Sequence, residues 1–174
     1  DADDWYEVNM CQEMFDTIEK SQADLVMCKT KVIIEDNIYN NDRAAYYNFV
    51  EAGLYNIDLD LIYKINAVLW NKIFRRDMIE KNKIEFPNNI RVGWDNCFVM
   101  EYLLFSNNIY YLDSILCNHR IHSLSLMGEI LSGDYKNIAD FWVCLEEFYK
   151  ILEQKNLLNE EVMEFFLKKY KNTT

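Results

Sequence analysis

The first residues of the chain, Asp1–Trp5, crowd three carboxylates into four positions. In an extended or turning segment, carboxylates two residues apart can point to one centre, and Mg²⁺ or Mn²⁺ prefers such oxygen ligands. An EF-hand calcium loop is excluded, because the positions that need a third oxygen ligand, a glycine and a closing glutamate hold Trp5, Tyr6 and Gln12. The motif alone leaves two interpretations open, a cation site and a solvated acidic end that caps the following helix.

Two further clusters stand at predicted element junctions. Trp70–Arg76 brings aromatic rings, an amide and three cations to a strand-to-helix junction. Its rings belong either to the core, with the cations solvated, or to a ligand site. Asp95 follows Gly93 and Trp94 at the start of a predicted helix. It is either the N-cap of that helix or a general base that takes a proton from a hydroxyl.

Both histidines of the chain lie in one short segment, Cys117–Ser123. Zinc is a poor fit, because no fourth ligand stands at a usual spacing. If the segment is a strand, the two-residue period puts Arg120 and His122 on one face, suited to an anion or a metal. His119 then faces the other way and is expected to be structural.

Hydrophobic periodicity predicts an α/β part, followed by a C-terminal helical pair. We expect the α/β part over residues 1–132 and the helical extension over 133–174. The stretch 37–56 is expected to be irregular or partly helical. Helices are predicted over 7–20, 58–66, 75–82, 95–105, 138–152 and 158–170. One or two strands are predicted over 25–28 and 32–34, and further strands over 67–70, 109–112 and 114–121.

The composition and charge of the chain argue against several classes of protein. The 174 residues are 51% hydrophobic and 15% aromatic, which suits one buried core. The net charge of −11 argues against a nucleic-acid partner. No apolar stretch approaches the ~20 residues of a transmembrane segment. The five cysteines are odd in number and none has CxxC spacing, which indicates reduced thiols in a cytoplasmic protein.

Taken in order, these clusters resemble the second half of a family 2 glycosyltransferase of the bacterial polysaccharide-building type, starting at its DxD motif. The resemblance covers roughly residues 1–127. It rests on the following segments, which match the family's motifs in the same order: Asp1–Trp5, Ala23–Cys28, Trp70–Arg75, Ile84–Pro87, Gly93–Phe98, Ile109–Asp113 and Arg120–Ser125. Two departures stand out, Trp94 where the family usually has Glu, and Cys117–His119 in place of a Tyr-rich stretch.

The resemblance implies a GT-A fold, with a mixed sheet and helices. It also implies the transfer of a sugar from a nucleotide diphosphate sugar to an acceptor hydroxyl, inverting and metal-dependent. Asp95 would be the catalytic base. The implied ligands of Mn²⁺ or Mg²⁺ are Asp1, Asp3, Asp4 and His122. The residues implied to contact the donor or shape the acceptor side are Arg120, His122, Ser125, Trp70, Asn71 and Lys72.

The same resemblance implies partners and a location. The full-length parent would bind the nucleotide-sugar donor and a glycan or lipid-linked acceptor, in the cytoplasm or peripherally at the inner face of the cell membrane. In this family the nucleotide base is held mainly by the part of the chain before the DxD motif. We therefore expect this chain alone to be an inactive fragment that forms a homodimer. The alternative is a non-catalytic protein-interaction domain derived from the family. A phosphate-metal hydrolase is disfavoured, because no nucleophile or second carboxylate cluster is present.

Overall fold

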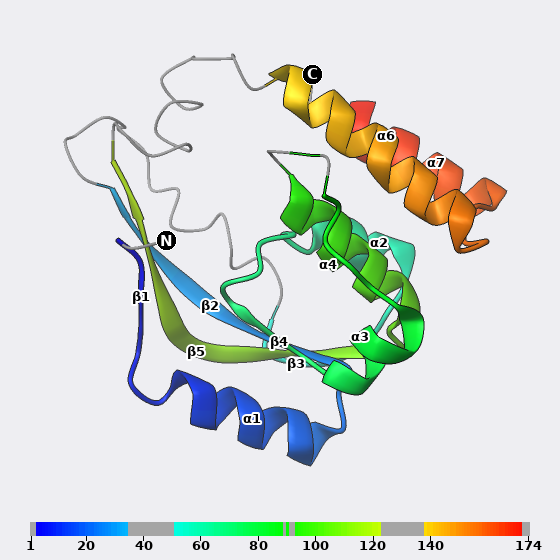
Figure 1. Cartoon of the computed structure of the whole chain (residues 1–174). Coiled ribbons are helices and arrows are strands. Elements are labelled where there is room, and N and C mark those ends of the chain that lie inside the picture. Colours follow the sequence, from blue (N-terminus) through cyan, green and yellow to red (C-terminus); the bar gives the residue numbers. More distant parts are fainter. Residues whose placement is uncertain (1–2, 35–50, 89, 91–92, 123–137, 172–174) are drawn as a thin grey trace.

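Two long parallel strands, β2 (Leu25–Ile34) and β5 (Asn108–Ile121), form the centre of a five-stranded mixed sheet (Figure 1). The computed structural model describes residues 3–34, 51–88, 90, 93–122 and 138–171. Three short strands pair antiparallel with the central two: β1 (Trp5–Tyr6) and β3 (Gly53–Asn56) with β5, and β4 (Lys72–Phe74) with β2. Both ends of β5 are thus paired on two sides.

The alternation of side chains along β2 separates two hydrophobic clusters. Val26 and Cys28 point to the face covered by α1 (Met10–Ser21), whose Met10, Met14 and Ile18 are buried against them. Leu25 and Met27 point to the opposite face and join the larger cluster. That face is covered by the remaining helices, which Figure 1 shows above the sheet: α2 (Leu59–Lys64), α3 (Arg76–Asn82), α4 (Trp94–Phe105), α6 (Ile138–Gln154) and α7 (Glu160–Lys171).

Helix α4 lies at the centre of the larger cluster, with seven consecutive buried residues from Cys97 to Leu103. Glu101 is one of these residues, and its carboxylate pairs with Lys155 just beyond α6. The Lys155 ammonium also donates to the carbonyls of Asn82 and Lys83 at the end of α3, at 2.6 and 2.7 Å. One cation therefore connects three helices and neutralises a buried charge.

The predicted fold class is confirmed, and so are the helices that correspond to α1, α2, α3, α4, α6 and α7. Asn159 caps α7 as its position suggests, accepting a hydrogen bond from the Val162 N–H at 2.9 Å. The proposed division between residues 132 and 133 lies outside the described residues and stays a prediction.

The sequence left one or two strands open over 25–28 and 32–34, and the structure has one, β2. Two strand predictions are corrected. The runs at 109–112 and 114–121 belong to the single strand β5. The strand expected over 67–70 is wrong: the Lys72 N–H bonds the Leu69 carbonyl in a turn, and the strand begins at Lys72. In the stretch expected to be irregular, Gly53–Asn56 is strand β3, which pairs with the start of β5.

No helix in the described part of the chain is both long enough and apolar enough to cross a membrane.

Candidate functional site

The acidic segment at the start of the chain lies against the end of β5. Strand β1 brings this about, because Trp5 pairs with Asn118 and Tyr6 with Cys117. As a result Asp3 and Asp4, which precede β1, meet residues more than a hundred positions away. The pairing accounts for a juxtaposition that no local motif in the sequence could specify.

Asp4 is held firmly in this arrangement. Its carboxylate accepts the backbone N–H of Arg120 at 2.9 Å, and its oxygens lie 3.0 and 3.2 Å from Nδ1 of His119. The Asp4 side chain is only 8% exposed. Asp4 therefore fastens the acidic segment to β5, and most of its capacity as a hydrogen-bond acceptor is already used.

Asp3 is more accessible and pairs with the other histidine. Its Oδ2 lies 3.1 Å from Nε2 of His122, and both side chains are about 30% exposed. A hydrogen bond from its own backbone N–H, with a smaller contribution from His122, holds the pKa of Asp3 below its ordinary value. Asp3 is thus an ionised carboxylate beside an imidazole that solvent can reach.

Divalent cations accept this donor set, since Mn²⁺ binds both carboxylate oxygen and imidazole nitrogen. Within the described ranges, however, no group of three or more His, Cys, Asp or Glu side chains is placed to hold a metal ion. Two of the residues in the prediction, Asp1 and Ser125, lie outside those ranges. Asp3 and His122 are therefore the described pair that fits a cation, with Asp4 behind them as an anchor.

Aromatic rings connect the C-terminal end of β5 to the segment Trp70–Lys72. The Trp70 ring stacks on His119 with a centroid distance of 5.1 Å and an interplanar angle of 18°. On the other side, the Arg120 guanidinium lies 5.2 Å from the centre of the Trp5 ring. Trp70 thereby fixes the orientation of the imidazole that holds Asp4.

Asn71 and Lys72, the next two residues, are buried. The Asn71 amide donates to the Cys28 carbonyl at 3.1 Å, and the Cys28 N–H donates to the Asn71 carbonyl at 3.0 Å. The Lys72 ammonium donates to the Val68 carbonyl at 2.6 Å and to Oδ1 of Asn71 at 2.9 Å. Both side chains are therefore parts of the framework, and their polar atoms point into it.

Asp95 lies in the first turn of α4, but it is not the N-cap. Gly93 takes that position with a φ of 87°, a left-handed conformation that favours glycine, and makes no side-chain cap. The carboxylate of Asp95 accepts the N–H of its neighbour Asn96 in the same turn, at 2.9 Å. Burial raises the pKa of Asp95, while the field of Lys72 opposes that rise. The helix-cap interpretation of Asp95 is thus wrong, and the general-base interpretation stays a prediction.

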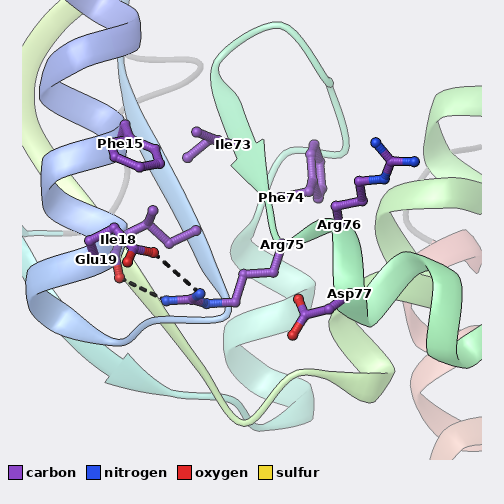
Figure 2. Close-up of a pocket in the computed structure, with 8 residues that line it drawn as sticks. All are labelled: Phe15, Ile18, Glu19, Ile73, Phe74, Arg75, Arg76 and Asp77. Carbon is purple, nitrogen blue, oxygen red and sulfur yellow. Dashed lines mark hydrogen bonds and ion pairs between the residues drawn. The ribbon is translucent and has the colours of Figure 1, made fainter.

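A pocket of about 230 Å³ opens between α1 and β4 (Figure 2). Figure 2 shows Arg75 reaching across it toward α1, where it donates to the carbonyls of Ile18 and Ala23 at 3.0 and 2.8 Å and pairs with Glu19 at 3.4 Å. Arg75 therefore ties the end of α1 to β4, a role that its motif did not suggest. None of the predicted site residues lines this pocket.

Comparison with known proteins finds a relative in sequence. The chain is 30% identical over 165 residues to the putative glycosyltransferase EpsH of Bacillus subtilis (strain 168). The chain is homologous to part of this putative glycosyltransferase. The match covers 92% of this chain and 46% of EpsH, so the chain spans about half the length of that relative. No family model matches it.

Solved structures share the fold of this chain. S. aureus TarS 1-349 matches with a TM-score of 0.62 and 18% identity, over 99% of this chain and 47% of TarS. The structure of TarS 1-349 in complex with UDP-GlcNAc matches with a TM-score of 0.61 and 22% identity, over 87% of this chain and 41% of TarS. The predicted resemblance to part of a glycosyltransferase is therefore confirmed.

Proposed function

We propose that this chain is part of an enzyme that transfers a sugar from a nucleotide diphosphate sugar to an acceptor hydroxyl. The observation that carries the proposal is the 30% identity to EpsH over nearly the whole chain. The likeness in fold to TarS, which has been solved with UDP and with UDP-GlcNAc, adds support for a nucleotide-sugar donor. Five reduced thiols agree with a cytoplasmic location.

The donor end of the proposed site is the pair Asp3 and His122. These two side chains would hold Mn²⁺ or Mg²⁺, and the cation would offset the negative charge that builds on the departing diphosphate. Asp4 and His119 keep Asp3 in place through the contacts described above. Arg120, whose backbone is held by Asp4, adds a cation at the same end of β5.

The acceptor end of the proposed site is Asp95. In an inverting displacement, the Asp95 carboxylate takes the proton of the acceptor hydroxyl as the acceptor oxygen bonds to the anomeric carbon. The bond from that carbon to the diphosphate oxygen breaks, and the nucleoside diphosphate leaves with the electron pair. A general base serves best when its pKa lies near the working pH, and burial moves the pKa of Asp95 in that direction.

The segment Trp70–Lys72 supports placing both ends in one site. Trp70 stacks on the His119 ring beside Asp4, and two residues later the field of the Lys72 ammonium acts on Asp95. Catalytic groups must flank one small reacting centre, so such continuity is what a shared site requires. The convergence of Asp3, Asp4 and Asp95 around one centre is part of this proposal.

The experiment compares two aspartates at equivalent helix positions in the full-length protein. Asp77 is the second residue of α3, as Asp95 is of α4, and it too accepts its neighbour's N–H, at 3.0 Å, but it is exposed. With Mn²⁺ and a panel of nucleotide diphosphate sugars, D95N should lose transfer by at least about 100-fold, as expected for a general base. D77N should transfer at the wild-type rate. Donor binding by calorimetry should survive in both variants.

A third variant, D3N, should weaken metal-dependent donor binding itself. Wild-type transfer by D95N would refute the catalytic role of Asp95. Failure of the wild-type protein to bind any nucleotide diphosphate sugar would favour the non-catalytic interaction domain instead.

A further inference from the structure

Two aromatic side chains form an exposed apolar patch at the start of α4. Phe86, in the segment between α3 and α4, is 45% exposed, and Trp94, the first residue of α4, is 42% exposed. Their rings contact each other edge-on, with a centroid distance of 5.4 Å and an interplanar angle of 77°. Single exposed apolar side chains are ordinary, but contiguous exposed rings are typical of a surface that binds a ligand or partner. We call these two rings the Phe86–Trp94 patch.

The patch is held in place from the core. The Phe86 ring stacks on the ring of Phe98, with a centroid distance of 4.3 Å and an interplanar angle of 16°. Phe98 is buried and lies edge-on to Phe74 of β4, at 5.5 Å. Just before Phe86, the buried Ile84 donates its N–H to the Ile79 carbonyl at 3.0 Å. The rings are therefore preorganised, and a ligand that stacks on them orders few side chains on binding.

The patch lies next to the proposed catalytic base. Trp94 directly precedes Asp95 in the first turn of α4. Successive side chains on a helix point about 100° apart, so the Trp94 ring flanks the Asp95 carboxylate and does not cover it. A substrate whose hydroxyl reaches Asp95 therefore has an exposed aromatic surface beside it.

The surroundings of the patch favour a sugar as its ligand. Glu85 and Asn88 are exposed on either side of Phe86 in the sequence, and Asn96 follows Asp95 at a half-buried position. The C–H groups on one face of a sugar ring suit the negative face of an aromatic ring, while its hydroxyls suit carboxylates and amides. Apolar rings with a few polar groups are the usual lining of a small-ligand site. The carboxylates of Glu85 and Asp95 disfavour an anionic membrane surface as the partner.

We propose that the Phe86–Trp94 patch is an acceptor subsite, where the Trp94 ring, supported by Phe86, stacks on a sugar of the acceptor next to the reacting hydroxyl. The proposal rests on the proposed function, because the ligand is an acceptor only if Asp95 is the base. Trp94 stands where the glycosyltransferase motif noted above usually has Glu. The subsite is therefore a feature by which this chain selects its acceptor.

The kinetic test uses the full-length protein and its acceptor. W94A should raise the KM for the acceptor by at least about five-fold, as expected when an aromatic anchor is removed from a binding surface. W94F keeps a ring and should retain most of the affinity. In both variants kcat should change less than KM, and donor affinity by calorimetry should be retained. An unchanged acceptor KM in folded W94A would overturn the proposal.

The control is F15A, which removes an exposed ring from α1 on the opposite face of the sheet. F15A should leave the acceptor KM unchanged, and an increase equal to that of W94A would overturn the proposal. If W94A fails to fold, W94E supplies the same comparison with a polar side chain at this exposed position.

A binding measurement on the 174-residue chain does not depend on transfer. The probes are N-acetylchitotetraose and cellotetraose at about 20 mM, which fills a site of millimolar affinity. The indole N–H resonance of Trp94, assigned by its loss in W94F, should shift saturably with at least one probe. No shift with either probe would overturn the proposal. A shift that follows protein concentration would assign the patch to a second copy of the chain and would also overturn it.

The two measurements together separate this proposal from the proposed function. Saccharide binding at Trp94 in a full-length protein that transfers no sugar would keep a carbohydrate site on this surface and refute the function. Transfer that depends on Asp95, with an acceptor KM that W94A leaves unchanged, would keep the function and refute the subsite.

Discussion

The burial of Lys72 makes a quantitative prediction about how stability depends on pH. The pKa of its ammonium falls from the ordinary value of 10.5 to about 7. Between those pH values the unfolded chain keeps a proton that the folded protein has released, so the free energy of unfolding rises with pH. Each pH unit adds up to about 1.4 kcal/mol, which gives about 5 kcal/mol over the whole interval as a ceiling.

The perturbation is Lys72→Met, which removes the titrating group and keeps a long apolar side chain. Urea unfolding of the wild-type chain and K72M, followed by tryptophan fluorescence, gives the difference in unfolding free energy at each pH. We expect that difference to move in favour of the wild type by roughly 2–3 kcal/mol between pH 7.5 and pH 9.5. Groups that titrate equally in both chains cancel in the difference.

The matched control is Lys20→Met, at an exposed position in the last turn of α1. The difference in unfolding free energy between K20M and the wild type should not change across the same pH range. If the difference in unfolding free energy for K72M does not change with pH, the pKa of Lys72 is not lowered in the folded chain. That result would contradict the burial of its ammonium.

Two further predictions concern packing around α4. Gly93→Ala should destabilise the chain by about 2 kcal/mol or more, because φ is 87° and a Cβ would lie 2.7 Å from Sγ of Cys144. Gly53→Ala, also at positive φ but with its nearest neighbour at 3.9 Å, should lower the melting temperature less, and equal losses would contradict the clash. Lys155→Met should cost roughly 3–5 kcal/mol at pH 7 by leaving the Glu101 carboxylate buried and unpaired. That loss should shrink as Glu101 is protonated at low pH, and a loss independent of pH would contradict the ion pair.

Local patterns predicted the elements that carry their own periodicity. The amphipathic α1, the largely apolar α4 and the C-terminal helices follow from spacing alone, because their hydrophobic faces repeat at helical intervals. Strands β3 and β4 escaped prediction because they are three or four residues long and owe their conformation to their partners. In β4 a buried lysine also breaks the apolar pattern that would mark a strand.

The candidate site was predictable in its residues but not in its pairings. The sequence singled out Asp3, Asp4 and both histidines, yet only the pairing of β1 with β5 assigns Asp3 to His122 and Asp4 to His119. Such contacts span more than a hundred residues, and no spacing rule reaches that far. The glycine N-cap before Asp95 was missed because an aspartate in a first turn is usually the better cap.

Asp95→Asn in the full-length protein, assayed with Mn²⁺ and the donor that the wild-type protein uses, is the most direct test of the proposed sugar transfer. Nucleoside diphosphate release coupled to acceptor glycosylation gives the rate, and calorimetry gives donor affinity. We expect a loss of transfer of at least about 100-fold with donor affinity retained, while Asp77→Asn behaves as wild type. Transfer at the wild-type rate by Asp95→Asn, or an equal loss in Asp77→Asn, would contradict the proposed role of Asp95.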